Sequence, residues 1–331
     1  MSRALDKDVV ASLKAGNPLA AYQAISGLLL QSSAGDGLLE IEILGRSHPF
    51  EDGVYLLQDG PAVGISKVGL VQAFLVARKL LMGHHGGTKV QTTECLFAAT
   101  AVLLLMDPEH LTAANTRKRL LRGLAAHRDE QQVVLEREKR LVDSLLTSRL
   151  HRHTKSPTLW NHRRWLLLEF TSLSLPVHVH ADITSVVLVA AERHPRNYYA
   201  WCHARFLMSL QATESSEPII ATIKKWCFQH HTDISGWSFL YFLLSTKGPS
   251  DATVSCSTFA EVLGLVSSLH LANESVWVFL RTLTASGLVD DQEYSQFKTV
   301  GQDLLGTAKE STDLRVLRSA LDWCETYRLS V

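Results

Sequence analysis

The chain has 331 residues, with 33 basic and 33 acidic side chains and a formal net charge of zero. Bulk nucleic-acid binding depends on neutralising phosphates, so this balance gives no reason to expect it. Hydrophobic residues make up 46% of the sequence, which is enough for an extended core and excludes a disordered chain. Because no apolar run reaches about 18 residues, no transmembrane segment is predicted.

The beginning of the chain has a β-like pattern that the rest lacks. Ranges 37–45 and 53–65 are apolar, and the second contains an Asp-Gly turn signal. We expect a short hairpin or an extended arm there, followed by a helix that begins at Lys67. Because this stretch is short and has no second core, residues 1–66 are predicted to be an N-terminal appendage with a β-hairpin, and residues 67–331 a helical-hairpin repeat solenoid.

Four of the seven tryptophans recur about every 40 residues in the same local sequence frame. They are Trp160, Trp201, Trp237 and Trp277. A preferred helix N-cap stands four residues before each of them, namely Ser156, Asn197, Asp233 and Asn273. A repeat period between 20 and 50 residues is typical of stacked-repeat proteins. We interpret the tryptophans as packing residues between helices, in preference to residues that stack on a ligand.

A fifth frame lies upstream, with Ala114 in the place of the tryptophan. Second helices are predicted between the frames, over Gln131–Leu150, Asp182–Arg193, Pro218–His230 and Thr258–Leu271. One helical hairpin cannot bury its own apolar face, so successive hairpins must stack. The sequence therefore predicts an all-α fold: a crescent-shaped α-solenoid of about five helical hairpin repeats with a short, partly extended N-terminal appendage.

Neither the histidines nor the cysteines have the spacing of a catalytic or metal site. None of the 15 histidines lies in an H-E-x-x-H pattern, and no C-x-x-C is present among the five cysteines. Phosphate-binding loops and nucleophile elbows are also absent. We therefore expect no catalytic residue, no metal ligand and no cofactor in this chain, which looks like a scaffold. The odd number of scattered cysteines and the lack of a secretory signal predict a cytoplasmic protein with reduced thiols.

One constellation has a physical argument for anion binding. Helix N-termini carry partial positive charge and free N–H donors, and a solenoid aligns several of them along one edge. Lys155, Arg196 and the phenols of Tyr198 and Tyr199 lie at two consecutive helix starts and supply charge and donors for a phosphate. The alternative is that Asn197 only caps its helix and that the tyrosines pack against the next hairpin.

The frames resemble the repeat of protein prenyltransferase α subunits, which runs roughly P-x-N-Y-x-x-W-x-x-R-x-x-x-L. Pro195–Trp201 and Lys155–Leu167 match it most closely, and the divergent branch of protein prenyltransferase α-subunit repeat-containing proteins is the most similar. The resemblance implies a helical crescent around a β subunit, an α/α barrel that carries the zinc. It also implies that Lys155, Asn197 and Tyr198 contact the diphosphate and substrate, whereas Tyr199 stands where the family has His.

The resemblance leads to a first hypothesis, an α subunit of a heterodimeric protein prenyltransferase that is not a catalyst alone. Its partners would be a prenyltransferase β subunit, a protein substrate with a C-terminal cysteine, and an isoprenoid diphosphate, with geranylgeranyl as the transferred group. The second hypothesis is a non-catalytic α-solenoid adaptor that kept the repeats and lost the chemistry. Ala114, Tyr199, and the replacement of the repeat arginine by Leu240 and Leu280 favour this second hypothesis.

Overall fold

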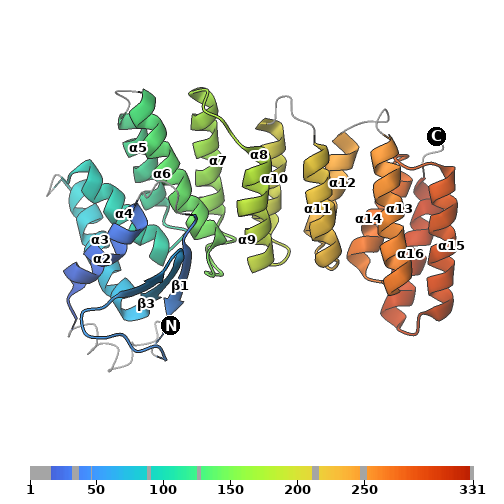
Figure 1. The fold of residues 1–331 in the computed structure, drawn as a ribbon, viewed down its shortest axis with the longest axis horizontal. Helices are drawn as coiled ribbons and strands as arrows, with labels where there is room; N and C mark the ends of the chain where they lie inside the picture. The colour runs from blue at the N-terminus through green and yellow to red at the C-terminus, as the bar shows by residue number, and fades with distance from the viewer. Residues whose placement is uncertain are drawn as a thin grey trace. The chain divides into compact units, whose positions relative to one another are not determined.

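The protein consists of two compact units, 1–206 and 207–331, and the boundary falls inside helix α10 (Tyr198–Leu210) (Figure 1). The structure is a computed structural model. It describes the residues 16–31, 37–45, 47–87, 91–124, 128–210, 216–246 and 252–328.

The first unit combines a small sheet with a series of helices. Its strands are β1 (Glu40–Leu44), β2 (Leu56–Asp59) and β3 (Ala62–Ser66). Its helices are α2 (Pro18–Leu30), α3 (Lys67–His85), α4 (Thr93–Met106), α5 (Leu111–Gly123), α6 (Arg128–Thr147), α7 (Pro157–Ser172), α8 (Val179–Asp182), the π-helical turn η1 (Ile183–Val187), α9 (Leu188–Arg193), and most of α10.

The three strands pair in the order β1-β3-β2. β2 and β3 form the predicted antiparallel hairpin, and its turn contains Gly60 with a φ of 55°, a conformation that glycine adopts without strain. β1 is parallel to β3, which the sequence pattern does not predict. The fold is therefore mostly helical with a small N-terminal sheet, and the expectation of an all-α fold was too narrow.

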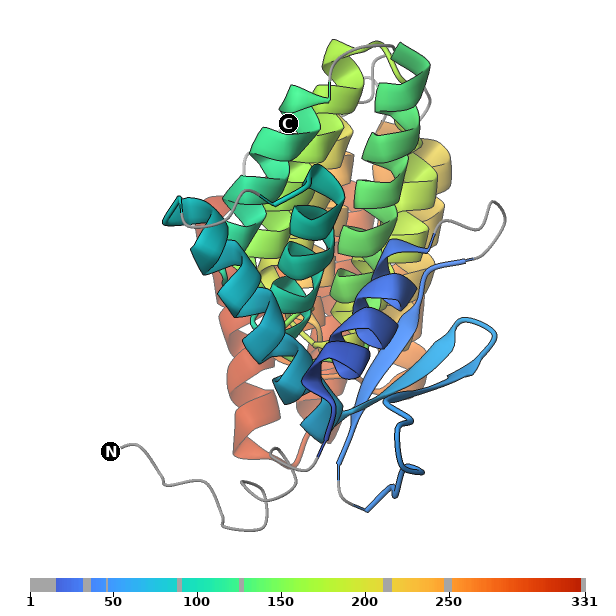
Figure 2. The ribbon, with the colours of Figure 1, turned by 90° about the vertical axis from the view of Figure 1, so that its left-hand side faces the viewer.

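The N-terminal residues share a core with the helices that follow them. Helix α2, which the sequence analysis did not predict, begins at the N-cap Asn17 and packs on α3 and α4. Ala21 and Ile25 of α2 and Ile41 of β1 are completely buried, and Figure 2 shows α2 and the sheet beside these helices. The two compact units divide at 206/207, and the expected division at 66/67, where β3 continues directly into α3, stays a prediction.

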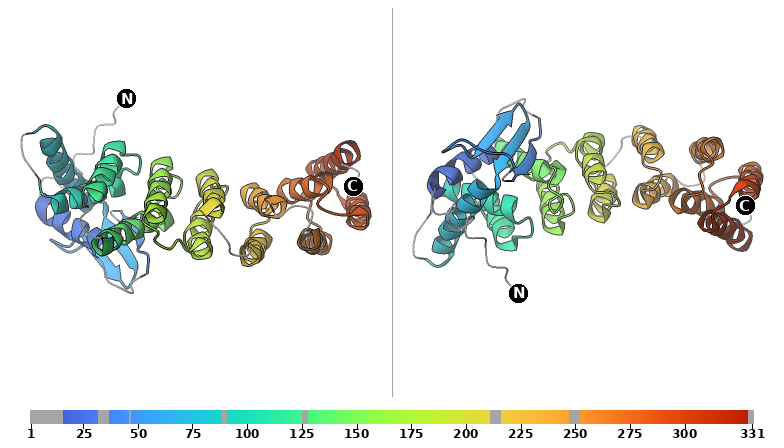
Figure 3. Two further views of the ribbon diagram at one scale, coloured as in Figure 1. Left: turned by 90° about the horizontal axis from the view of Figure 1, so that it is seen from above. Right: turned by 90° about the horizontal axis from the view of Figure 1, so that it is seen from below.

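Beyond the sheet, the helices of the first unit pack as hairpins. α4 contacts α5, α6 contacts α7, and contacts between alternate helices, α5 with α7 and α6 with α9, join one hairpin to the next. Because α5 contacts both α6 and α7, and α6 contacts both α7 and α9, these helices stand in two rows, which are seen end-on in Figure 3. This is the packing of a helical repeat.

The second unit repeats the same packing with helices alone among its described residues. Its helices are α11 (Glu217–Gln229), α12 (Ile234–Thr246), α13 (Ala252–Leu269), α14 (Glu274–Ala285), α15 (Asp291–Thr307) and α16 (Ser311–Tyr327). α12 contacts α14 and α14 contacts α16 in one row, while α11 contacts α13 and α13 contacts α15 in the other. The described part of the chain contains no helix with the length and apolarity needed to cross a membrane.

The four predicted N-caps are confirmed. The side chains of Ser156, Asn197, Asp233 and Asn273 each accept a hydrogen bond from a backbone N–H two or three residues ahead. Each helix therefore begins one turn before its tryptophan, as the frame predicts.

The frame tryptophans are buried packing residues with a second structural role. The indole N–H of Trp160, Trp237 and Trp277 donates in each case to the backbone carbonyl six residues upstream, at 2.9–3.0 Å. The ring thus packs in the core while its N–H fixes the loop that leads into its own helix. At these three frame positions tryptophan meets both requirements, whereas a phenylalanine would leave the carbonyl without this donor.

Candidate functional site

The starts of α7 and α10 lie side by side because one backbone carbonyl joins them. The Thr154 carbonyl accepts a hydrogen bond from Trp160 Nε1 at 2.9 Å and another from Asn197 Nδ2 at 2.7 Å. Asn197 Nδ2 also reaches the Ala190 carbonyl, and its Oδ1 caps α10 through the Ala200 N–H. Asn197 is therefore buried and committed to structure, as the alternative interpretation of this residue expected.

Lys155 follows Thr154 directly, so its backbone is held at the edge where the two helices begin, while its side chain is exposed. The imidazole rings of His151 and His194 lie there too, with centroids 4.4 Å apart. Partial burial, His151 and the Lys155 ammonium group lower the pKa of His194. Arg196 joins the edge with a φ of 58°, in the left-handed region that non-glycine residues seldom adopt. The edge is therefore cationic and locally constrained.

The two tyrosines are exposed at the first turn of α10. Tyr198 is 68% exposed and Tyr199 39% exposed, and their rings meet edge to face with centroids 5.5 Å apart. A hydrogen bond with Cys202 raises the pKa of Tyr198. The Tyr198 side chain therefore interacts with Cys202 of its own helix, whereas the charge of Lys155 is felt by His194. The structure brings Asn197 and the Lys155 loop into contact, and it leaves the binding role of the four predicted residues a prediction.

A buried cluster of charges surrounds Glu138 of α6. Arg117 of α5 forms a bidentate ion pair with Glu138, through Nε at 2.7 Å and Nη2 at 2.5 Å. His162 Nε2 lies 2.8 Å from the same carboxylate. Burial alone would raise the pKa of Glu138, but Arg117 and His162 lower it to about 2. Glu138 is therefore a fixed anion that joins α5 and α7 to α6.

A second buried cluster surrounds Arg163 of α7. Its guanidinium donates to Asp143 Oδ1 at 2.7 Å and forms an ion pair with Asp182 Oδ1 at 2.9 Å. Lys139 Nζ lies 2.7 Å from an oxygen of each of these carboxylates. The third Arg163 nitrogen, Nη1, lies 2.7 Å from His203 Nε2, which must therefore be the unprotonated acceptor. Burial, followed by Arg163, lowers the pKa of His203 well below its usual range.

These two clusters were not predicted from the sequence, although the repeat frame carries a signal for them. Arg117 and Arg163 both stand three residues after the frame position, and His162 and His203 both stand two residues after it. Arg117 of α5 and Arg163 of α7 thus each form a buried tie to a carboxylate of α6. In the Trp201 frame the corresponding residue is Ala204, so this tie ends at α7 within the first unit.

Helices α5, α7 and α10 also present a row of cations and aromatic rings, which we call the cation–aromatic row. Lys118 and Arg122 of α5 lie over the Trp165 ring of α7, at 5.6 and 5.4 Å from its centroid. Arg164 of α7 lies over the Phe206 ring of α10 at 4.7 Å. Burial and the nearby Arg122 lower the pKa of Lys118, which indicates a concentration of positive charge. Partly exposed arginine and aromatic groups of this kind are enriched in protein interfaces.

One group of side chains in the described residues has the proximity of metal ligands. Ligand atoms of Cys256, Asp290 and Glu293 lie within 4.8 Å of one another. Asp290 and Glu293, however, form a reciprocal capping box at the start of α15, which already occupies their oxygens with backbone N–H groups. We therefore assign this group to helix capping.

The fold and the two clusters define a helical-hairpin repeat protein whose repeat motif supplies buried ties between helices. Residues 135–170 match the protein prenyltransferase alpha subunit repeat, and residues 159–264 match the ECM9 middle domain. The first match covers most of α6 and α7, and thus Glu138, Asp143, His162 and Arg163. The chain thus contains a match to the protein prenyltransferase alpha subunit repeat and is similar to proteins that carry this repeat.

Individual relatives support the same assignment. Protein prenyltransferase alpha subunit repeat-containing protein 1 of Danio rerio is 30% identical over 46% of this chain and 38% of the relative. Protein ECM9 of Saccharomyces cerevisiae is 31% identical over 46% of this chain and 41% of its own length. Geranylgeranyl transferase type-2 subunit alpha of Candida albicans is a weaker match, 26% identical over 38% of this chain and 33% of the relative. The chain thus matches less than half the length of each relative.

Proposed function

We propose that the chain is the α subunit of a heterodimeric protein prenyltransferase, with a β subunit as its partner. The observation that carries the proposal is the pair of joined helix starts, where Asn197 holds the Lys155 loop against α10. Lys155, Tyr198 and Tyr199 are exposed at these helix starts, where the imidazole rings of His151 and His194 also lie. The match to the protein prenyltransferase alpha subunit repeat and the weaker match to a geranylgeranyl transferase subunit support the proposal.

The proposal also covers the arrangement of the repeats around the β subunit and the cellular location of the complex. The helical repeats would form an α-solenoid of about five hairpins that curves around an α/α-barrel β subunit. The cation–aromatic row has the composition of a partner-binding face, which supports a protein partner that binds α5, α7 and α10. We place the complex in the cytoplasm, and we place the zinc in the β subunit.

In the proposed reaction, the thiolate of a C-terminal cysteine attacks C1 of a geranylgeranyl diphosphate. The bond from C1 to the diphosphate oxygen breaks, and the diphosphate leaves with the electron pair. The zinc of the β subunit would supply activation of the thiolate. This chain would supply Lys155 and the phenols of Tyr198 and Tyr199 to the leaving diphosphate, because preorganised cations and donors stabilise charge that develops in the transition state.

The test is co-expression with prenyltransferase β subunits, followed by measurement of complex formation and of geranylgeranyl transfer to a peptide with a C-terminal cysteine. Lys155→Ala is expected to lower the transfer rate by about tenfold or more while the heterodimer stays intact, as for loss of one cation at a leaving group. Lys309→Ala, which changes an exposed lysine of the second unit, is the matched control. An unchanged rate for Lys155→Ala would remove this residue from the site.

The adaptor remains the second candidate because of two observations. Asn197 is fully engaged by the Thr154 and Ala190 carbonyls and by its own helix start, so its amide is used for structure. The neighbouring Tyr199 stands where the family has His. A complex that forms with a β subunit and transfers no prenyl group to any acceptor would favour the adaptor. Failure to form any complex would contradict the α-subunit proposal itself.

A further inference from the structure

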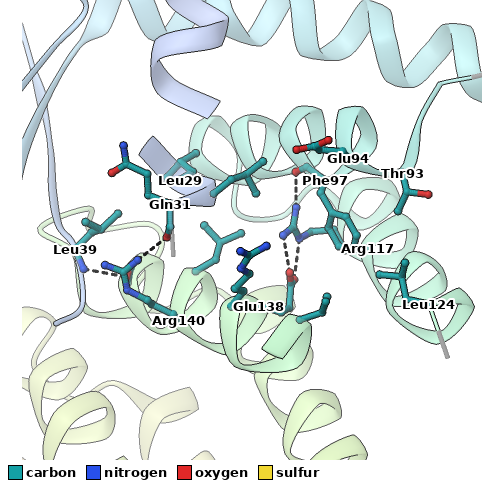
Figure 4. A pocket seen from close by; sticks show the side chains of 15 residues that line it. Leu29, Gln31, Leu39, Thr93, Glu94, Phe97, Arg117, Leu124, Glu138 and Arg140 are labelled. Carbon is teal, nitrogen blue, oxygen red and sulfur yellow. Dashed lines mark hydrogen bonds and ion pairs between the residues drawn. The ribbon is translucent and has the colours of Figure 1, made fainter. Parts of the chain in front are cut away.

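The first unit contains a cavity of about 500 Å³ that the proposed function does not use. It lies between the end of α2, the start of α4, and helices α5 and α6, and Figure 4 shows its lining side chains. Cavities of about 300–1,000 Å³ are typical of sites for small molecules. The volume therefore fits a ligand of small-molecule size.

The walls of the cavity are apolar side chains from four segments of the chain. Leu29 lies in the last turn of α2, Leu39 precedes β1, Phe97 belongs to α4, and Val134 and Leu141 lie on α6. Leu29, Leu39 and Leu141 are buried, whereas Phe97 and Val134 are partly accessible. Because an apolar cavity of this size favours transfer of apolar surface from water, the body of its ligand should be a hydrocarbon.

The charged pair that borders the cavity is already satisfied by the protein. Arg117 donates to both oxygens of Glu138, to the Phe97 carbonyl at 2.6 Å and to Thr100 Oγ1 at 2.8 Å. Figure 4 shows this pair joined across the lining. A ligand placed here gains little by competing for these hydrogen bonds, since breaking a buried pair costs several kcal/mol. The deep part of the cavity is therefore a place for an apolar chain and not for an anionic head.

Positive charge lies instead on the α6 side of the lining. Arg137 is exposed, and Arg140 is partly exposed with its guanidinium on the carbonyls of Gln31 and Gly37. These two acceptors are neutral, so among the described residues the bonds leave the positive charge of Arg140 without a counter-charge. The acidic Glu94 lies on α4 and is also exposed. An anion entering the cavity is therefore attracted to the α6 side and repelled from the α4 side.

We propose that this cavity binds a single-chain amphiphile, an aliphatic chain that ends in an anionic head. The chain lies against the apolar walls formed by Leu39, Phe97 and Leu141, and the head lies against Arg137 and Arg140. A carboxylate and a phosphate share the chemistry that the two guanidinium groups recognise. This inference is independent of the proposed function, because it needs neither a β subunit nor a prenyl donor.

The test is a titration of the full chain with dansyl-undecanoic acid, whose fluorescence rises on transfer to an apolar site. Saturable binding of one probe per chain is expected, with displacement by dodecanoic acid and by dodecyl phosphate. Dodecanol is expected to displace the probe about tenfold less well, because it lacks the charge-assisted contact to arginine. Equal displacement by dodecanol and dodecanoic acid would overturn the assignment of the anionic head, and a lack of probe binding would overturn the whole proposal.

Two variants locate the bound probe. Val134→Trp fills the cavity from α6 and is expected to weaken probe binding at least tenfold, while Arg137→Glu is expected to weaken the acid about tenfold and leave dodecanol unchanged. Arg119→Glu, on the exposed part of α5 outside the lining, is the matched control and should bind as the native chain does. Circular dichroism verifies that each variant is folded. A folded Val134→Trp protein with native affinity would place the probe elsewhere and overturn the proposal.

Discussion

The two units use one repeat position in opposite ways. Three residues after the frame position, the first unit has Arg117 and Arg163, which are buried in ion pairs with α6. The second unit has Leu240 and Leu280 at the corresponding places, and both are completely buried in an apolar core. The same helical hairpin can therefore be closed by a charge cluster or by aliphatic packing.

The difference concerns specificity more than net stability. Ion pairs lose much of their Coulomb attraction to desolvation, and an apolar replacement of similar volume is often neutral or stabilising. Removing one partner is a different matter, because the other charge stays buried without compensation. The first unit should therefore be the more sensitive to point mutation and to acid, and the second the more tolerant of both.

The largest effect is expected from Arg163→Leu, which gives the first unit the leucine that the second unit has at this repeat position. The variant leaves Asp143 and Asp182 buried beside Lys139 alone, so it should lower the free energy of unfolding by about 3–5 kcal/mol. Urea denaturation at pH 7 measures the loss. Arg164→Leu, at the neighbouring exposed position, is the matched control and should cost less than about 1 kcal/mol. Equal losses in the two variants would contradict the role assigned to the Arg163 cluster.

A smaller effect is expected from acid, and it should be confined to the first unit. Burial lowers the pKa of His153 to about 4 and lowers those of His162 and His203. A histidine whose pKa is lower in the folded chain stabilises the fold above its unfolded pKa of about 6.5, and this contribution is lost as the pH falls. For His153 the loss should reach about 3 kcal/mol near pH 4.

Hydrogen exchange followed by mass spectrometry at pH 7, 5.5 and 4.5 can locate this loss. Helices α6 and α7 are expected to lose protection before α12 and α14 do. His153→Gln keeps a side-chain N–H for the Leu104 and Leu105 carbonyls and removes the titrating group. It should therefore flatten the pH dependence. Earlier loss of protection in the second unit on acidification would contradict the assignment of acid sensitivity to the buried histidines of the first unit.

The smallest loss of stability should be equal in the two units, because both contain the same tryptophan hydrogen bond. Trp160→Phe in the first unit and Trp237→Phe in the second each remove the indole donor to the carbonyl six residues upstream. Each should cost about 2 kcal/mol, from an unsatisfied carbonyl and a smaller ring. Thermal unfolding of the two variants tests this. A clearly larger loss for either one would mean that the tryptophans are not equivalent.

Much of the helical framework was predictable because its determinants are local. An N-cap needs only a side-chain oxygen within three residues of the N–H that it accepts, so Asn197 and Asn273 could be identified from their spacing to tryptophan. Helix α2 was missed although Asn17 and Pro18 form an ordinary start signal. The parallel pairing of β1 with β3 was missed for a different reason, since its partners, such as Glu40 and Ala62, are 22 residues apart and nothing in the periodicity specifies them.

The site divides in the same way. The sequence directed attention to the two helix starts with Lys155 and Tyr198, and the structure shows that these starts are joined through the Thr154 carbonyl. The amide of Asn197 turned out to be used up by that junction. The cation–aromatic row and the cavity lined by α2, α4, α5 and α6 could not be predicted, because they depend on side chains from helices that meet only in the folded unit.

The sequence by itself determined the repeat frame, the helix starts and the burial of the tryptophans, since each of these is fixed within about two turns of helix. Only the tertiary structure decided which charges meet. Arg163 finds Asp143 on the preceding helix and Asp182 just before the π-helical turn, from opposite directions along the chain. Hairpin stacking brings these groups together, and a buried charge is tolerated only where packing supplies its partner.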